Sequence, residues 1–298
     1  MLRGTGRRRA LALTLISVLL WGCDRDAAPT ATVDNAAGSA DDAVKQEVKA
    51  GHVSGKVVTV DGKPVSDVDV EISGTNVAGG FSEFKLKTDA SGAYALKVPN
   101  GTYKVAARLT RKLGEFHYLC ELVPAGAEQP SFDSTPGAVR NFVWRIDGLR
   151  PGAAASPGET RSYLGGSIQL KQGDPNSHAD ETFKFPAGSK VEMTLKPDGQ
   201  LLDGSEGKPL SHSFTLDTEI RFTHYSKRTW LDIPIGKYTA SATLTEPGGA
   251  PKPLRVAMRY YNGPKVPLGS SATVVFPTSD TGFGLTPYVG TADVHVMP

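Results

Sequence analysis

The chain has 298 residues, which is longer than one typical domain and predicts two folded units once a leader and a linker are set aside. It carries 33 Lys and Arg against 31 Asp and Glu, but four of the arginines lie in the first nine residues, and without them the balance is 29 against 31. That balance excludes the clustered basic face of a nucleic-acid-binding protein, and two cysteines, Cys23 and Cys120, are too few for a disulfide framework.

Residues 1–22 have the features of an export signal. A basic start precedes an apolar run over residues 10–22, which has the ~7–15-residue length of a secretory core. The run is shorter than the ~20 residues that a helix needs to cross a bilayer. A permanent transmembrane anchor is therefore the weaker interpretation.

The run ends in Leu20-Trp21-Gly22-Cys23, which resembles the lipobox of bacterial lipoproteins. Leu20, Gly22 and Cys23 fit that pattern, and Trp21 departs from it because a small residue is usual there. The resemblance implies that Cys23 carries fatty acyl chains such as palmitate and becomes the mature N-terminus. It implies a protein of the bacterial cell envelope, lipid-anchored to a membrane and facing the periplasm or the exterior. The alternative is a soluble secreted protein in which Cys23 is incidental.

Residues 23–50 form the next segment, which has almost no large apolar side chain. Such a composition cannot bury enough surface to fold, and this predicts a disordered tether. A flexible chain of this length spans on the order of 30 Å, by the ~5–6 Å × √n rule.

Short runs rich in Val, Thr, Tyr and Phe follow, separated by turn-forming pairs such as Asp61-Gly62 and Asn100-Gly101, whose residues tolerate positive φ. The pattern predicts an all-β fold of two β-sandwich domains in tandem, over residues 51–148 and 163–298. Seven strands are expected in the first domain: 53–60, 65–73, 81–88, 93–98, 102–109, 115–123 and 139–146. Alternation places Tyr103 in the core with Phe142 and Trp144 opposite.

Four short segments of the first domain carry a family resemblance. They are Val53-Ser54-Gly55-Lys56-Val57-Val58, Asp61-Gly62-Lys63-Pro64-Val65, Thr88-Asp89-Ala90-Ser91-Gly92-Ala93-Tyr94 and Val98-Pro99-Asn100-Gly101-Thr102-Tyr103. Together they resemble the carboxypeptidase regulatory-like family, a transthyretin-like seven-stranded sandwich. The match covers about a third of the chain and consists mostly of turn formers and core positions. It implies a fold and an accessory or interaction role, and it carries no catalytic residue.

Residues 149–162 are rich in Pro, Gly and Ala, which is typical of a linker. The region after it echoes the first domain, because residues 98–109 align with residues 233–244 at an offset of 135 and place Tyr238 where Tyr103 stands. A true repeat and two unrelated sandwiches with a common turn both remain open. Nine strands are expected there: 166–171, 190–196, 211–216, 219–223, 229–233, 238–245, 254–260, 272–276 and 291–296.

Three groups of polar residues are candidates for reactive or metal sites. Cys120 and His117 are three residues apart in a strand and so point to opposite faces, which favours a buried structural cysteine over a catalytic pair. Asp67, Asp69 and Glu71 alternate along a strand and could bind calcium, although a solvated face is the better interpretation.

The third group belongs to the second domain. His212 and His224, with Asp217 and Glu219 nearby, could form a metal or acid-base site, although scattered surface histidines on hairpins are the better interpretation. No sequence motif demands an enzyme, and we expect no catalytic residue, no metal and no cofactor.

Four aromatic residues of the second domain are candidates for a binding surface: Tyr225, Trp230, Tyr260 and Tyr261. Tyr260 and Tyr261 are consecutive in a strand, so both cannot face the core. Exposed rings beside polar side chains can stack on sugars or grip a protein. The sequence therefore predicts a non-catalytic module that binds or scaffolds an envelope protein, with carbohydrate binding through these rings as the alternative. A hydrolase using His212 and His224 is the weakest hypothesis.

Overall fold

The computed structural model describes residues 48–126, 131–156, 158–176, 185–216, 228–259, 264–278 and 289–298. The predicted signal, the predicted acylation site Cys23 and most of the predicted tether lie outside these residues. Within the described part, no helix is long and apolar enough to span a bilayer.

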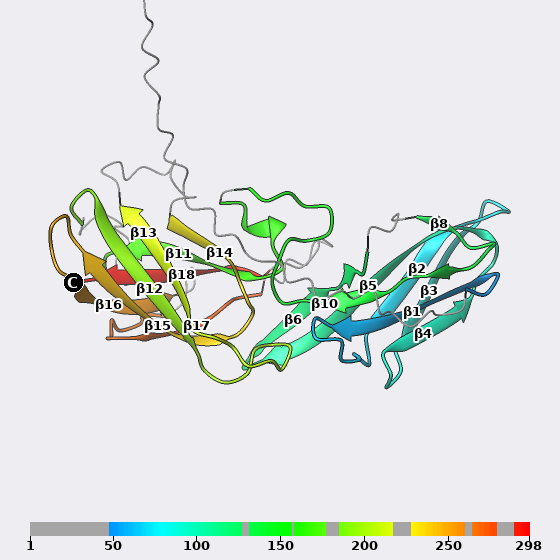
Figure 1. Ribbon diagram of the computed structural model, residues 1–298, viewed down its shortest axis with the longest axis horizontal. Coiled ribbons are helices and arrows are strands. Elements are labelled where there is room, and N and C mark those ends of the chain that lie inside the picture. Colours follow the sequence, from blue (N-terminus) through cyan, green and yellow to red (C-terminus); the bar gives the residue numbers. More distant parts are fainter. Residues whose placement is uncertain are drawn as a thin grey trace, which may run out of the picture. The chain divides into compact units, whose positions relative to one another are not determined.

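Strands dominate the first half of the described chain (Figure 1). They are β1 (His52–Thr59), β2 (Asp69–Asn76), β3 (Phe81–Lys87), β4 (Ala93–Lys97), β5 (Gly101–Leu113), β6 (Phe116–Glu121), β7 (Val123–Pro124), β8 (Phe132–Asp133), β9 (Ala138–Val139) and β10 (Phe142–Trp144). All seven expected strands are present. Sequence patterns missed β8, because two residues are too few to show an alternation. Strands β7 and β9 overlap the ends of the expected strands 115–123 and 139–146, which the structure interrupts at Leu122 and at residues 140–141.

These strands form two sheets. One has the antiparallel order β3-β2-β5-β6, with β8 beside β5, and the other has the order β4-β1-β10-β7, with β9 beside β1. In the second sheet β1 and β10 are parallel. Only Leu122 separates β6 from β7, so a single stretch of chain crosses from one sheet to the other.

The second half repeats this arrangement. Its strands are β11 (Gly166–Gln172), β12 (Ser189–Pro197), β13 (Leu210–Leu216), β14 (Thr229–Ile233), β15 (Lys237–Thr245), β16 (Lys252–Arg259), β17 (Ala272–Val275) and β18 (Thr291–Met297). Eight of the nine expected strands are confirmed, and the one at residues 219–223 lies outside the described residues. The strand order is β13-β12-β15-β16-β18-β11-β14, with β17 beside β15.

Strand β16 is shared by both layers of this second sandwich. Its residues 252–254 pair with β15 and its residues 255–259 pair with β18, as β6 and β7 do in the first half. Strands β11 and β18 are parallel, as β1 and β10 are. The two sandwiches therefore have the same topology, strand for strand, which favours the repeat suggested by the aligned segments at Tyr103 and Tyr238.

Side-chain alternation explains the two cores. Tyr103, Phe142 and Trp144 are buried in the first, as predicted, and Tyr238 is buried in the second. Glycine is needed at residue 101 for close packing, since a Cβ there would lie 2.3 Å from the carbonyl oxygen of Thr75. Of the two turns expected to allow positive φ, Asp61-Gly62 has it, since φ is 80° at Gly62, whereas φ is not positive at Gly101.

The expected strand at residues 65–73 begins late, at Asp69. The buried Thr88 hydroxyl donates to the Val65 carbonyl oxygen at 2.8 Å and accepts from the Val68 amide at 3.0 Å, so these backbone groups bond outside the ladder. Asp67 has a φ of 59° and is not in a strand. The predicted alternation of Asp67 with Asp69 and Glu71 is therefore wrong at its first residue.

Candidate functional site

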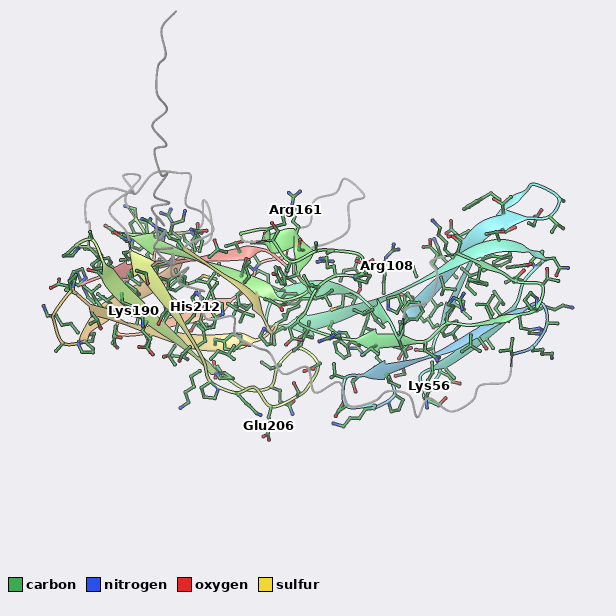
Figure 2. The ribbon with its side chains drawn as sticks, turned by 45° about the horizontal axis from the view of Figure 1, so that its top comes forward. Lys56, Arg108, Arg161, Lys190, Glu206 and His212 are labelled. Atoms are coloured by element: carbon green, nitrogen blue, oxygen red, sulfur yellow. The ribbon has the colours of Figure 1, made fainter. Side chains whose placement is uncertain are left out.

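Two of the predicted site residues meet at the open side of the second sandwich. His212, labelled in Figure 2, is on the edge strand β13. Trp230 is on the edge strand β14. Their rings are stacked, with centroids 5.2 Å apart and planes at 18°. The His212 and Phe214 rings are T-shaped, with centroids 4.7 Å apart. Trp230 packs against the core, and burial lowers the pKa of His212. The pair covers the apolar interior between the two edge strands.

This stack brings together residues that the sequence assigned to different hypotheses. One face of the Trp230 ring is occupied by His212, so a sugar can stack only on what remains exposed. His224, Tyr225, Tyr260 and Tyr261 lie outside the described residues, and the predictions for them stay predictions. Among the described residues, no group of three His, Cys, Asp or Glu side chains could hold a metal ion.

Cys120 is a buried structural residue. Burial raises the pKa of its thiol to about 11, so the nucleophilic thiolate is scarce at neutral pH. His117 is exposed on the other face of β6. The alternation excludes a Cys120–His117 catalytic pair, as the sequence suggested.

The remaining acidic residues of β2 are neutralised across the sheet. Asp69 forms an ion pair with Lys87 at 3.0 Å, and Glu71 lies 3.5 Å from Arg108. Both carboxylates thus face cationic side chains on neighbouring strands, which suits a solvated sheet face better than a calcium site.

A junction between the two sandwiches provides the most developed polar geometry in the described chain. The Tyr118 hydroxyl on β6 donates to the Phe276 carbonyl oxygen at 2.6 Å. The Gly148 amide donates to the Asp232 carboxylate at 2.7 Å, and the Ile235 amide donates to the Ile146 carbonyl oxygen at 3.2 Å. Each bond joins a residue before position 149 to one after position 163.

Apolar contacts reinforce these hydrogen bonds. Leu202 and Ile235 belong to the second half of the chain, yet both are buried with the core of the first sandwich. Residues 149–162, expected to be a spacer, form a loop closed at its base, where Leu149 pairs with Tyr163 and the Arg150 amide donates to the Ser162 carbonyl oxygen at 2.9 Å. The composition indicated a linker but not that its ends meet.

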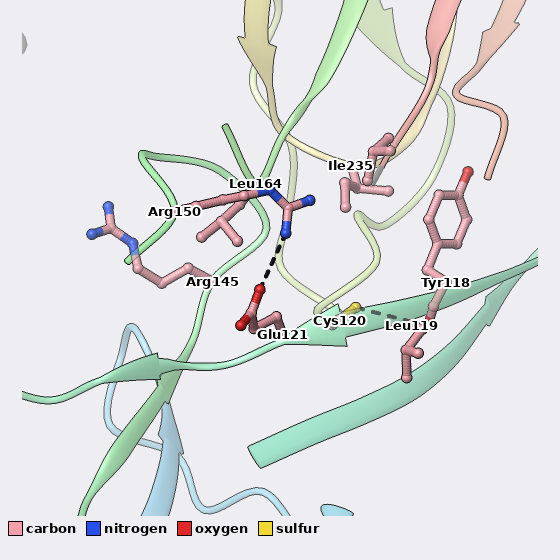
Figure 3. A pocket seen from close by; sticks show the side chains of 9 residues that line it. Tyr118, Leu119, Cys120, Glu121, Arg145, Arg150, Leu164 and Ile235 are labelled. Atoms are coloured by element: carbon pink, nitrogen blue, oxygen red, sulfur yellow. Dashed lines mark hydrogen bonds and ion pairs between the residues drawn. The ribbon is translucent and has the colours of Figure 1, made fainter. Parts of the chain in front are cut away.

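A cavity of about 20 Å³ lies in this junction (Figure 3). Its walls include Tyr118, Cys120, Glu121, Arg150 and Ile235. Arg150 and Glu121 form an ion pair of 3.3 Å across it, with the Arg150 side chain 13% exposed. The volume suits about one water molecule and no larger ligand. The cavity is therefore a packing detail of the joint.

Two half-buried carboxylates lie in the same junction. Burial raises the pKa of Asp232, whose φ is 59°, and the charge of Asp147 raises it further. Burial also raises the pKa of Asp147, which the nearby Arg145 opposes. Sequence reasoning missed this group, although charged residues alternating with apolar ones around Ile146 are a signal of a half-buried segment.

Comparisons with known proteins identify no family. No family model matches the chain, and no curated protein matches it. Among solved structures, the Bacillus anthracis TIE protein is similar, at 11% identity and a TM-score of 0.33 over 82% of this chain and 49% of that one. A streptococcal ancillary pilin has 10% identity and a TM-score of 0.23 over 85% of this chain and 64% of that one.

A DUF3823 family protein from Bacteroides ovatus has 11% identity and a TM-score of 0.21, over 76% of this chain and 99% of that one. This chain thus spans about half of the TIE protein and under two thirds of the ancillary pilin.

Proposed function

We propose that this chain is a non-catalytic lipoprotein of the bacterial cell envelope that is tethered to a membrane through Cys23. Its two sandwiches act together as a binding or scaffolding module. The first sandwich, over residues 51–148, is of the carboxypeptidase regulatory-like type, and the second extends over residues 163–298. The partner is an envelope protein.

The junction is the observation that carries this proposal. A scaffold must hold its binding surfaces at a defined separation, whereas domains on a free linker move independently. The three hydrogen bonds of the junction pair four backbone groups, the Tyr118 hydroxyl and the Asp232 carboxylate across the two sandwiches, and an unsatisfied buried group costs about 1–3 kcal/mol. The bridge between Leu149 and Tyr163 closes the base of the connecting loop and so shortens the link between the sandwiches.

The fixed separation can be measured with two spin labels. Lys104 on β5 and Lys190 on β12 are exposed and report on different sandwiches. In a chain with Cys23 replaced, labels at positions 104 and 190 should give a narrow distance distribution, and Tyr118→Phe should broaden it. A broad distribution in the parent chain would contradict the scaffold.

Partner binding is tested in cells. A photo-crosslinking residue at exposed Arg108 or Lys190 should capture a reproducible envelope protein from the full chain at the membrane. The Cys23→Ala chain, released from the membrane, should lose the adduct. Adducts formed equally by both chains would contradict a membrane-proximal role.

A further inference from the structure

The turn between β2 and β3 is an apolar tip that no described residue covers. Val77 is 82% exposed and Phe81 is 72% exposed, which are the two largest values among the exposed large apolar side chains of the described chain. None of residues 72–82 is charged. Exposed apolar side chains gathered at one point mark an interaction site more often than scattered ones do.

The backbone amides of this turn are already paired in hydrogen bonds within the protein. The Asn76 side-chain oxygen accepts from the Ala78 amide at 3.0 Å and from the Gly80 amide at 3.1 Å. The Gly79 amide donates to the Asn76 carbonyl oxygen, and the Val77 amide donates to the Asn100 carbonyl oxygen, both at 2.9 Å. The tip can therefore leave water without exposing unpaired amide donors to an apolar medium.

The tip lies at the end of the sandwich where the tether joins. Asn76 pairs with Gly101, the Gly101 amide donates to the Ser134 hydroxyl at 3.0 Å, and the Gly51 amide donates to the Ser134 carbonyl oxygen at 3.2 Å. Gly51 is thus linked through Ser134 and Gly101 to Asn76 at the base of the tip, so the start of β1 and the tip lie at the same end of the sandwich. Val48, the first described residue, follows Cys23 by 25 positions.

The length of that tether places this end near an anchoring membrane. A flexible chain of 25 residues spans about 28 Å on average by the ~5–6 Å × √n rule, and even full extension reaches only ~85 Å. Exposed Lys49 and Lys97 lie at the same end, since Lys97 pairs with His52 at the start of β1. Cations beside an apolar tip suit a surface of anionic lipid headgroups.

We propose that the Val77–Phe81 tip inserts into the interfacial region of the membrane that holds Cys23, and so orients the first sandwich on that surface. The inference rests on the proposed lipid anchor. The anchor supplies the affinity, because two side chains alone bind weakly, and the tip sets the orientation.

Val60 provides a matched control. It is 67% exposed and follows the last residue of β1, at the other end of the same sandwich. The eight residues of β1, roughly 26 Å long at ~3.3 Å per residue, separate Val60 from Gly51 at the tip end. Val77→Trp and Val60→Trp both place a ring in open solvent. In full chain recovered from membranes and reconstituted in phosphatidylethanolamine and phosphatidylglycerol vesicles, brominated lipids should quench the added fluorescence of Val77→Trp and leave that of Val60→Trp unchanged. Equal quenching, or none in either, overturns the proposal.

The anchor and the tip fail in different ways. If the full chain recovered from cells carries no acyl groups and does not bind the vesicles, the proposed function is refuted. Coupling its Cys23 thiol to a maleimide lipid then supplies an anchor, so that quenching of Val77→Trp tests the tip by itself. Cys120 does not compete, because its buried thiol has a pKa of about 11. An acylated, vesicle-bound chain with an unquenched tip refutes only this inference.

A second measurement separates lipid from protein as the occupant. In the acylated chain that carries Val77→Trp, Phe81→Ser should reduce quenching by brominated lipid, because one apolar side chain is removed from the interface, and Val60→Ser should leave the quenching unchanged. A photo-crosslinker at position 77 that couples to a protein in cells, and not to lipid, overturns the proposal in favour of a protein partner.

Discussion

The hydroxyl of Tyr118 in the first sandwich donates to the carbonyl oxygen of Phe276 in the second, across 2.6 Å. Both residues are almost completely buried. Phe276 follows β17, whose counterpart in the first sandwich is β8, and Tyr118 is on β6, whose counterpart is β16. The repeats are therefore joined by non-equivalent surfaces, which makes the joint a specific feature of the pair.

Tyr118→Phe should lower the stability of the joint by about 1 kcal/mol, since it leaves the Phe276 carbonyl oxygen without its donor. For a chain of this size that corresponds to roughly 2–4 °C in Tm. The matched control is Tyr94→Phe, which removes a hydroxyl that donates to the Arg140 carbonyl oxygen within the first sandwich. Calorimetry and limited proteolysis at residues 149–162 distinguish them. Cleavage there that rises equally in both variants would refute the role of Tyr118.

Asp232→Asn should stabilise the protein at pH 7 and flatten its pH dependence. Because the pKa of Asp232 is raised in the folded state, the folded chain binds more protons than the unfolded chain between the ordinary value near 3.8 and the raised one. Stability from this group therefore falls as the pH rises through the folded pKa. Asn keeps an oxygen for the Gly148 amide and tolerates the positive φ.

The measurement is Tm between pH 7 and about pH 4.5. The parent chain should gain stability relative to Asp232→Asn as the pH falls. Asp198→Asn, which breaks an exposed ion pair with Lys237, is the control and should change stability by under about 1 kcal/mol. Parallel pH profiles for the parent and Asp232→Asn would rule out the proposed linkage.

Cys120 should react with a thiol reagent at pH 7.5 at least about a hundredfold more slowly than an exposed cysteine, because both its raised pKa and its burial oppose attack. Leu119→Cys in a chain lacking Cys23 supplies the exposed reference, since Leu119 is the neighbouring exposed residue on β6. Rapid labelling of native Cys120 would mean that the junction opens readily.

Trp230→Ala should destabilise the second sandwich by about 1–3 kcal/mol, a smaller effect than for a fully buried ring, because it uncovers the core beside His212. Trp230→Phe should recover part of this loss. Pull-down on peptidoglycan or polysaccharide checks the alternative role. Glycan binding that is lost in a folded Trp230→Phe chain would instead favour the carbohydrate hypothesis.

The sequence predicted the strands and cores because alternation and turn residues are local signals. Tyr103 and Tyr238, which are buried in equivalent strands, are good examples. The late start of β2 was not readable, since it depends on the Thr88 hydroxyl, which binds backbone groups about twenty positions away.

The junction between the sandwiches and the stack of His212 on Trp230 could not be predicted from the sequence either, because both depend on contacts between residues far apart in the chain. Asp232 and Gly148 are 84 positions apart, and the contact of His212 with Trp230 depends on two edge strands meeting. Composition suggested a spacer where the chain instead closes a loop. Long-range pairings of this kind are set by topology, which local patterns do not specify.

The lipid anchor at Cys23 is tested by the intact mass of the full-length product recovered from membrane fractions, measured beside a Cys23→Ala variant. We expect a mature chain that begins at Cys23 and carries added acyl mass, with no such species from the variant. An unmodified product in the soluble fraction would contradict it.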